Sequence, residues 1–319
     1  KQPEQWKSIN GLCYIDKEGQ YQDNGLARVL TFDQLVAPEE SCFFNWSKPF
    51  VQLETTRGCF NTCAFCVSGG EKPVRTLSID AIRQRLQTIH RHGIQNVRVL
   101  DRTFNFNPRR AKELLNLFLE FHPHIRFHLE IHPALLSEEL KSELKKLPKG
   151  LLHLEAGIQS LREPVLEKCR RLGKLSDALE GLKFLCSLDN METHADLIAG
   201  LPLYRLNEIF EDILSLAEYQ AGEIQLESLK LLPGTEMRRR AEELGIRYSP
   251  LPPYEVLQTH EITTDELQVT RRLSRLLDAY YNTPAWQVLT RKLILKVKGF
   301  LPHFLGYLTE ANLIDQPMS

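Results

Sequence analysis

The sequence predicts an α/β protein organised around a parallel sheet. Between residues 49 and 244, short apolar runs alternate six times with stretches in which apolar residues recur at helical spacing. Repeated strand-helix units imply parallel strands, because each right-handed crossover brings the chain back in the same direction. The chain has 319 residues, enough for one large domain and an extension. We expect a connector over 1–48, the sheet domain over 49–244 and a mainly helical extension over 245–319.

The first strand and helix of the sheet domain carry clear local signals. Residues 50–54 are mostly apolar and predict the first strand. Apolar residues at helical spacing over 78–92 predict a helix, with Ser78 as its N-cap and Gly93 as its stop. The remaining expected strands are 96–100, 126–131, 151–156, 193–199 and 224–230, and the remaining expected helices are 108–121, 137–147, 163–171, 176–188, 207–219 and 235–244.

The amino-terminal segment is rich in turn-forming residues. Its Asn-Gly pairs predict a hairpin over 12–30, because this dipeptide favours tight turns between strands. Residues 32–46 are interpreted as a connector that crosses a surface.

The carboxyl-terminal segment is predicted to be mainly helical. Thr263 and Glu266 form the capping box of a helix over 263–282, and another helix follows over 283–298. The second helix has a basic face, for which solvation is the favoured interpretation and contact with an acidic partner the alternative. Its basic residues are Arg291, Lys292, Lys296 and Lys298.

Composition narrows the functional classes. The formal net charge of −1 gives no basic surplus, so a nucleic-acid partner is disfavoured, although a local basic patch stays open. No apolar run approaches the ~18 residues that span a bilayer, so no membrane contact is expected. No signal-peptide pattern is present. Crowding of three of the seven cysteines into one loop favours reduced thiols in a cytoplasm. The chain begins at Lys1 without a Met, which agrees with removal of residues upstream.

Three cysteines, Cys59, Cys63 and Cys66, follow the first predicted strand at C-x-x-x-C-x-x-C spacing. Cysteine thiolates are the usual ligands of iron-sulfur centres, and three of them leave one iron of a four-iron cluster open to another ligand. No fourth cysteine follows nearby. The alternative is a structural zinc site, which is usually closed by four Cys or His ligands and here would need His90 or His92.

The spacing, with Phe65 just before the last cysteine, resembles the radical S-adenosylmethionine superfamily. The resemblance implies a partial, six-unit TIM-like barrel with its active site at the carboxyl ends of the strands. It also implies a [4Fe-4S] cluster whose open iron binds the amino and carboxylate groups of S-adenosylmethionine, with Phe65 beside this cofactor. One electron, from an external donor such as flavodoxin or ferredoxin, then cleaves the cofactor to methionine and a 5′-deoxyadenosyl radical.

The ends of strands two and three supply further expected cofactor contacts. Many family members carry Gly-Gly-Glu after strand two to hold the methionine amino group, whereas this chain has Asp101 and Thr103. By position, Asp101 is the expected acceptor and Thr103 the second one, and a surface loop is the alternative for Asp101. Strand three ends with Glu130, also expected at the site, and with His132, for which a structural role is favoured.

Strands four and five resemble two other motifs of the family. E-A-G-I-Q-S is similar to a stretch near the ribose and methionine portions, which implies Glu155 and Gln159 as contacts. Arg171 resembles an arginine that neutralises the methionine carboxylate, although a solvated helix face explains it nearly as well. In D-L-I-A-G-L-P, the backbone around Ile198 and Gly200 is expected to pack on adenine.

In their order along the chain, D-R-T-F-N-F-N, E-A-G-I-Q-S, D-L-I-A-G-L-P and L-K-L-L-P-G-T resemble the cobalamin-dependent branch of the superfamily. Members normally carry a cobalamin-binding domain upstream, which this chain lacks, and residues 1–48 resemble the connector after it. Residues 245–319 resemble an extension of one uncharacterised subgroup. The resemblance implies methyl transfer from methylcobalamin to an unactivated carbon of an unidentified substrate. Rearrangement or cyclisation, radical modification of RNA or protein, and a non-catalytic iron-sulfur electron carrier stay open as alternatives.

Overall fold

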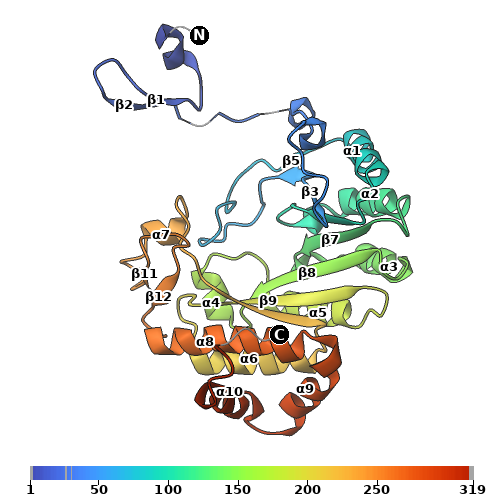
Figure 1. Cartoon of the computed structure of the whole chain (residues 1–319), viewed down its shortest axis with the longest axis vertical. Coiled ribbons are helices and arrows are strands. Elements are labelled where there is room, and N and C mark those ends of the chain that lie inside the picture. The colour runs from blue at the N-terminus through green and yellow to red at the C-terminus, as the bar shows by residue number, and fades with distance from the viewer. Residues whose placement is uncertain (1–2, 26, 30, 316–319) are drawn as a thin grey trace.

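The computed structural model describes residues 3–25, 27–29 and 31–315 (Figure 1). Its first segment stands apart from the rest of the molecule and consists of η1 (Pro3–Ser8) and an antiparallel hairpin of β1 (Cys13–Ile15) and β2 (Tyr21–Asp23). The predicted hairpin is confirmed over these strands, whereas residues 26 and 30 lie outside the described part. Two 3₁₀ turns, η2 (Phe32–Gln34) and η3 (Pro38–Glu40), lead to the sheet domain.

The centre of the molecule is a six-stranded parallel sheet in which neighbours along the chain are also neighbours in space. The order is β10-β9-β8-β7-β6-β3. The first and last strands form opposite edges, so the sheet is the partial TIM-like barrel that was predicted. Its strands are β3 (Val51–Leu53), β6 (Asn96–Val99), β7 (Arg126–Ile131), β8 (Leu152–Gln159), β9 (Glu192–Ala199) and β10 (Glu223–Ser228).

Helices alternate with these strands and cover one face of the sheet (Figure 1). The first, α1 (Ile79–Arg91), begins where the hydroxyl of Ser78 accepts a hydrogen bond from the backbone N–H of Ala81 at 3.2 Å. It is followed by Gly93 with a φ of +74°, a conformation that ends helices. The other helices of this layer are α2 (Pro108–Leu119), α3 (Glu138–Lys146), α4 (Glu163–Lys168), α5 (Leu175–Cys186) and α6 (Leu206–Glu218). The short α7 (Glu236–Arg239) lies apart from this layer, where the N–H of Met237 donates to the carbonyl oxygen of Ala64 at 2.8 Å (Figure 1).

Alternation along each strand separates an apolar face from a polar one. On β7, Phe127 and Leu129 are buried, and the ring of Phe127 stacks on Phe118 of α2 with centroids 4.0 Å apart. Because successive side chains of a strand point to opposite faces, His128 and Glu130 point away from the helices. They face the inside of the barrel, and β8 repeats the pattern. The barrel interior is therefore lined largely by polar and charged side chains.

The carboxyl-terminal extension covers the β10 edge of the sheet. The amide of Asn282 accepts from the N–H of Ile224 at 2.9 Å and donates to its carbonyl oxygen at 3.0 Å. The hydroxyl of Tyr281 donates to the carbonyl oxygen of Ala221 at 2.9 Å. An uncovered edge strand exposes unpaired backbone groups, so these contacts protect the sheet. The elements are β11 (Arg247–Tyr248), β12 (Val256–Gln258), α8 (Thr264–Leu276), the π-helical η6 (Leu277–Tyr281), α9 (Pro284–Lys296) and α10 (Phe300–Glu310).

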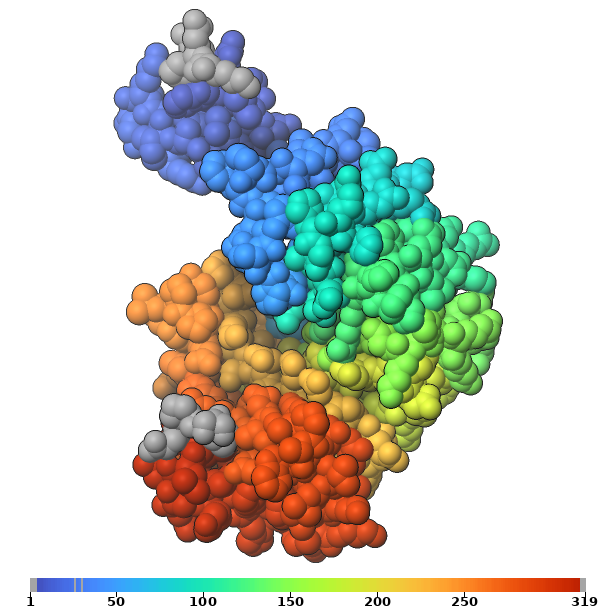
Figure 2. Space-filling model, turned by 45° about the vertical axis from the view of Figure 1, so that its right-hand side comes forward, coloured from blue at the N-terminus to red at the C-terminus, as the bar shows by residue number. Residues whose placement is uncertain are grey.

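The extension lies at the end of the molecule opposite the amino-terminal hairpin (Figure 2). The capping box of Thr263 and Glu266 is present at the start of α8. On α9, Arg291 points inward, donates to the carbonyl oxygen of Ala221 at 3.0 Å and lies over the ring of Tyr281. The other three basic residues of the predicted face are exposed. Within the described ranges, no helix is both long and apolar enough to cross a lipid bilayer.

Several element boundaries differ from the sequence-based ones. β8 extends beyond residue 156, because its pairing with β9 continues through a bulge between Gly157 and Gln159. α4 ends at Lys168, and Arg170 then adopts a left-handed φ of +57°, so Arg171 lies beyond the helix on which it was predicted. α7 is shorter than predicted, and α10 and the β11–β12 hairpin were not predicted.

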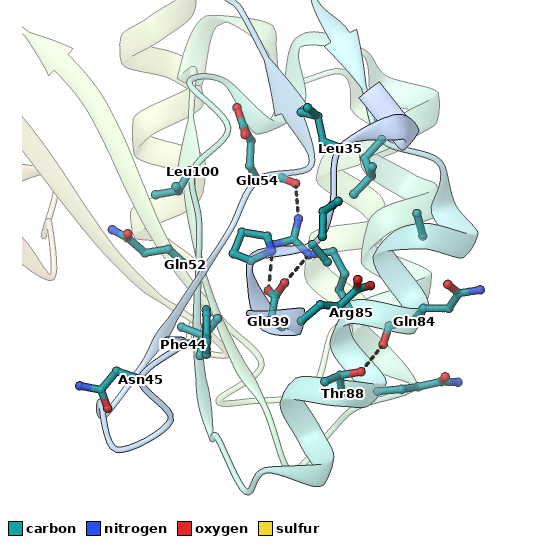
Figure 3. A pocket seen from close by; sticks show the side chains of 18 of the residues that line it. Leu35, Glu39, Phe44, Asn45, Gln52, Glu54, Gln84, Arg85, Thr88 and Leu100 are labelled. Atoms are coloured by element: carbon teal, nitrogen blue, oxygen red, sulfur yellow. Dashed lines mark hydrogen bonds and ion pairs between the residues drawn. The ribbon is translucent and has the colours of Figure 1, made fainter. Parts of the chain in front are cut away.

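A cavity of about 860 Å³ lies between the connector, α1 and the β3 edge (Figure 3). At its wall, the guanidinium of Arg85 donates to both carboxylate oxygens of Glu39, at 3.0 and 2.8 Å. The same guanidinium reaches the carbonyl oxygen of Glu54 at 3.5 Å. Glu39 is 7% exposed, so this ion pair fixes the connector to the sheet domain.

Candidate functional site

The three cysteines lie in a loop that begins at the end of β3. The base of the loop is an antiparallel pairing of β4 (Thr56–Arg57) with β5 (Arg75–Thr76). Gly58 follows with a φ of +100°, and a Cβ atom there would lie 2.5 Å from the carbonyl oxygen of Glu71. Only glycine accepts this backbone conformation without strain. The path of the loop therefore depends on Gly58.

The cysteine thiols are free and are spread across the loop. Cys59 and Cys63 are buried, and Cys66 is half-buried. In the described part of the chain, two groups bring three metal-ligating atoms within 4.8 Å of one another, and neither contains these cysteines. At least two of the three sulfurs are therefore further apart than that. This spread fits ligands that bind separate irons of a cluster better than ligands that surround one ion.

The histidines that a zinc site would need lie elsewhere. The ring of His92 stacks on Trp46 with centroids 3.7 Å apart. The ring of His90 packs beside Phe121 and His124. Both histidines are thus committed to contacts around α1, and neither supplies a fourth ligand to the cysteine loop. The zinc alternative loses its support.

Asp101, at the end of β6, fixes the start of the cysteine loop. One carboxylate oxygen accepts from the backbone N–H groups of Thr55 and Thr56, each at 2.8 Å, and the other accepts from the hydroxyl of Thr55. Burial raises the pKa of Asp101, and these hydrogen bonds oppose the rise. The residue is 1% exposed. The predicted direct contact of Asp101 with a cofactor is therefore corrected: the carboxylate is enclosed and positions the loop.

The cysteine loop is docked on the turn that follows α4. The backbone N–H of Ala64 donates to the carbonyl oxygen of Cys169 at 2.8 Å. The side-chain oxygen of Asn61 accepts from the N–H of Leu172 at 2.9 Å, and the hydroxyl of Thr62 donates to the carbonyl oxygen of residue 170 at 3.0 Å. The turn after α4 therefore positions the cysteine loop. Asn61, inside the motif, was missed as a site residue because the partner that reveals its role, Leu172, lies 111 positions further along the chain.

Arg171 lies beside the thiols. Its guanidinium is 3.6 Å from the sulfur of Cys63, and it donates to the carbonyl oxygen of Gly157. Burial raises the pKa of Cys63, and the positive charge of Arg171 opposes that rise. Arg170, by contrast, is exposed and pairs with Glu236 at 2.6 Å. Arg170 therefore lies on the solvated surface, whereas Arg171 faces the cysteine loop.

Thr103 and Phe65 also lie close to the loop. The hydroxyl of Thr103 is 3.9 Å from the sulfur of Cys59, and the residue is 8% exposed. Phe65 is half-buried and packs against the hydrophobic core. Both positions agree with the predicted neighbourhood, and their contact with a cofactor stays a prediction.

Glu130 and Glu155 face one another across adjacent strands inside the barrel. They are register partners of β7 and β8. Burial and then the charge of Glu155 raise the pKa of Glu130 to about 7, while Arg102, at 3.8 Å, opposes the shift. Burial alone would also raise the pKa of Glu155, but the hydrogen bond from His128 and the nearby ring of His194 lower it instead. The pair thus combines a readily protonated carboxyl group with a permanent carboxylate.

Gln159 ends β8 in a conformation that is rare for a residue with a side chain. Its φ is +73°, at the bulge of the strand. A Cβ atom on Gly157 would lie 2.5 Å from the amide nitrogen of Gln159, so the glycine makes room for this side chain. Backbone strain of this kind tends to persist at functional sites, where surrounding contacts enforce it. The observation supports Gln159 as a site residue.

The remaining predicted residues have different surroundings. Ile198 is half-buried on the inner face of β9. Gly200, with a φ of +89°, packs close to Val256 of the extension. His132 is 5% exposed, and burial followed by the charge of Arg171 lowers its pKa to about 3. Its enclosure agrees with the structural role that was favoured.

A group of histidines inside the barrel was not predicted from the sequence. His128 of β7, His153 of β8 and His194 of β9 have ring centroids 4.9 to 5.6 Å apart. His128 lies two positions before Glu130, and His153 lies two positions before Glu155. Alternation along the strands could therefore have placed them on the inner face.

Family models match two segments of the chain. A model of the Radical SAM superfamily matches residues 53–216, about half of the chain. A second model, described as a protein of unknown function (DUF4080), matches residues 242–312.

Two curated relatives are similar over the same region. The cobalamin-dependent radical SAM methyltransferase TokK of Streptomyces tokunonensis is 24% identical over 211 residues, which cover 63% of this chain and 31% of TokK. A tRNA-2-methylthio-N(6)-dimethylallyladenosine synthase of Herpetosiphon aurantiacus is 24% identical over 210 residues, which cover 60% of this chain and 46% of the synthase. The matched region spans less than half of either relative.

Solved structures of two enzymes share the fold. OxsB, a cobalamin-dependent S-adenosylmethionine radical enzyme, aligns with a TM-score of 0.61 at 14% identity, over 96% of this chain and 56% of OxsB. The methyltransferase TsrM of Kitasatospora setae aligns with a TM-score of 0.55 at 17% identity, over 64% of this chain and 42% of TsrM. At such identities the likeness concerns the fold alone, and it confirms the partial barrel.

Proposed function

The chain belongs to the Radical SAM superfamily, and on this premise we propose that Cys59, Cys63 and Cys66 hold a [4Fe-4S] cluster and that S-adenosylmethionine binds beside it. With S-adenosylmethionine bound, the reduced cluster would supply the electron that yields a 5′-deoxyadenosyl radical. The observation that carries the proposal is the set of three free thiols on one loop, of which at least two have sulfurs more than 4.8 Å apart. A carrier of electrons normally keeps four protein ligands on its cluster, whereas this loop offers three.

The chain's own residues position the cofactors and control charge. Arg171, fixed between Cys63 and β8, favours the thiolate and is suited to pairing with the methionine carboxylate. Asp101 holds the start of the loop by accepting from the backbone N–H groups of Thr55 and Thr56. Such positioning is the protein's part in cofactor chemistry of this type.

The inner ends of the strands supply the other proposed cofactor contacts. Gln159 lies at the bulge of β8. Glu155, four positions earlier on the same strand, faces the interior of the barrel together with its register partner Glu130. The remaining proposed contacts are Phe65, Thr103, Ile198 and Gly200.

For the reaction that follows, we propose methyl transfer to an unactivated carbon with cobalamin as the methyl carrier. Support comes from the ordered set of motifs and from the similarity to TokK, described as a cobalamin-dependent methyltransferase. Residues 1–48 would then connect an upstream cobalamin-binding domain to the barrel over 49–244, and 245–319 would cover the last strand. Flavodoxin or ferredoxin is the proposed class of electron donor.

Anaerobic reconstitution tests the central proposal. The reconstituted chain, given a reductant and S-adenosylmethionine, is expected to release 5′-deoxyadenosine and methionine, measured by chromatography with mass detection. Cys66→Ala should abolish both products, and Cys13→Ala, which removes an exposed cysteine outside the loop, should leave them unchanged. Formation of a redox-active cluster without either product would identify an electron carrier instead. Methyl transfer is tested with added cobalamin in a chain that carries the proposed upstream cobalamin-binding domain.

A further inference from the structure

Two histidines and two carboxylates converge inside the barrel, on three adjacent strands. Nε2 of His128 is 2.8 Å from Oε2 of Glu155. Nε2 of His194 is 3.5 Å from the same oxygen and 3.4 Å from Oδ1 of Asp196. The ligand atoms of His128, Glu155 and His194 all lie within 4.8 Å of one another. The parallel register of β7, β8 and β9 creates this cluster from residues that are far apart in the sequence.

Two buried atoms of this cluster lack hydrogen-bond partners within the described ranges. They are Nε2 of His194 and Oδ1 of Asp196. The side chain of His194 is 4% exposed. An unpaired buried polar atom costs about 1–3 kcal/mol. Nε2 of His194 lies within 3.5 Å of both Oε2 of Glu155 and Oδ1 of Asp196, so a ligand bound among these atoms would supply the missing partners.

We propose that His128, Glu155 and His194 bind a divalent transition-metal ion, with Asp196 as an additional oxygen donor. Two imidazoles and one carboxylate form the donor set of mononuclear zinc sites and of non-haem ferrous sites. The ion joins the two atoms that otherwise lack partners. This site is independent of the cysteine loop, and the proposal does not rest on the proposed function.

The surroundings of His194 suit a metal ligand. When Nε2 binds the ion, the ring proton resides on Nδ1, which lies 2.9 Å from Nε2 of His153. His153 then carries its own proton on Nδ1, which faces Oε2 of Glu192 at 3.4 Å. Hydrogen bonds of this kind fix the tautomer and orientation of a ligating histidine. In the structure Nδ1 of His153 accepts from Arg126 at 3.0 Å. The tautomer that suits the ion therefore requires Arg126 to release Nδ1 and keep its contact with Glu192.

A cavity gives the ion a way in. It has a volume of about 480 Å³, opens at the amino-terminal ends of the strands and is lined by His128, His153 and His194. The side chains of His128 and Glu155 are 25% and 32% exposed, so one side of the cluster faces open space. Because zinc and ferrous ions accept five or more ligands, an ion held by these three residues and Asp196 still has a position for water or for an oxygen donor of a substrate. Because the metal uses Oε2 of Glu155, the other oxygen stays free for the cofactor contact proposed above.

Metal titration tests the site directly. In a chain with Cys59, Cys63 and Cys66 replaced by alanine, whose fold is verified by circular dichroism, Zn²⁺ is titrated against a chromophoric chelator. We expect one tightly bound ion per chain. His128→Gln and Glu155→Gln should each weaken binding at least about tenfold, as loss of a ligand or its support does. The matched control is His124→Gln, which changes an exposed histidine outside the cluster and should leave binding unchanged.

A second measurement uses the intact chain and decides the matter if the alanine background does not fold. After anaerobic reconstitution with Fe²⁺ and sulfide, the bound iron should exceed the acid-labile sulfide, and His128→Gln should restore equal amounts. The proposal is overturned if iron equals sulfide in the intact chain, or if the excess and the zinc affinity survive both His128→Gln and Glu155→Gln. Neither readout depends on cleavage of S-adenosylmethionine, so a failure of that reaction is distinguished from a failure here.

Discussion

The guanidinium of Arg171 lies 3.6 Å from the sulfur of Cys63, although the two residues are 108 positions apart in the chain. The same side chain donates to the carbonyl oxygen of Gly157. A fixed cation therefore lies between the thiol of Cys63 and the last residues of β8. It opposes the effect of burial on the pKa of Cys63 and marks the side of the loop where an anionic cofactor group would be met.

Arg171→Gln should raise the pKa of Cys63 further, because burial would then act without the opposing charge. At a fixed pH near neutrality, less thiolate would be present and alkylation of Cys63 in the cluster-free chain should slow. Mass mapping of iodoacetamide-labelled peptides measures this rate for each cysteine. Arg170→Gln, which removes an exposed neighbouring charge, is the control. Equal rates in the two variants would contradict the assigned role of Arg171.

Asp101→Asn should destabilise the start of the cysteine loop. The amide keeps one acceptor oxygen and places an N–H₂ group where the carboxylate now accepts from Thr55 or Thr56. We expect a loss of about 1–3 kcal/mol in the free energy of unfolding, with lower iron content after reconstitution. Urea denaturation and iron assay measure these effects. Asp189→Asn, at an exposed position, should change neither, and full iron content in Asp101→Asn would refute the positioning role.

Gly58→Ala should block correct closure of the loop. The new Cβ atom would lie 2.5 Å from the carbonyl oxygen of Glu71, at a φ of +100°. The backbone must shift, so we expect iron incorporation to fall. Gly70→Ala is the matched control in the same loop, because its φ of +74° is also left-handed but nothing lies within 4 Å of the added atom. Its cost is limited to about 1–2 kcal/mol of backbone strain. Similar losses in both variants would show that backbone strain suffices and that the close approach is unimportant.

Glu130 should make folding stability depend on pH. Its pKa is raised from 4.5 to about 7, so the folded chain keeps a proton that the unfolded chain has already lost. The associated stability is fully present below pH 4.5 and is lost as pH rises through about 7. Glu130→Gln removes this titration. Above neutral pH, the free energy of unfolding of the variant should exceed that of the wild type by about 1–2 kcal/mol, after allowance for solvent screening.

Denaturant titrations between pH 4 and 8 measure this difference. The control is Glu227→Gln on β10, where the carboxylate is 61% exposed. A wild type and a Glu130→Gln variant with parallel stability profiles would show that Glu130 titrates normally.

Glu39→Gln should release the connector from the sheet domain. The change leaves the charge of Arg85, 13% exposed, without its carboxylate partner. Loss of one partner of a buried ion pair costs about 3–5 kcal/mol. We expect this cost to act locally, as faster proteolysis and hydrogen exchange of residues 32–46 with little change in β7 and β8. Glu40→Gln alters the exposed neighbour, and equal protection in the two variants would mean that the ion pair does not hold the connector.

Much of the fold could be predicted from local sequence. Ser78 caps α1 and Gly93 ends it, and Thr263 with Glu266 starts α8, because each signal acts within one helical turn. The order of six strand-helix units implied the parallel sheet and the position of the cysteine loop at its carboxyl edge. The boundaries of β8 and α4 were wrong, since a bulge at Gln159 and a left-handed Arg170 depend on neighbouring elements.

The sequence by itself determined the cysteine loop and the alternation of strands and helices, because these depend on residue types at short spacing. Only the tertiary structure decided that Arg171 meets Cys63, that Asp101 is enclosed by the loop, and that His128, Glu155 and His194 converge. Such contacts depend on strand register, because a shift of one residue would turn each side chain to the opposite face of the sheet.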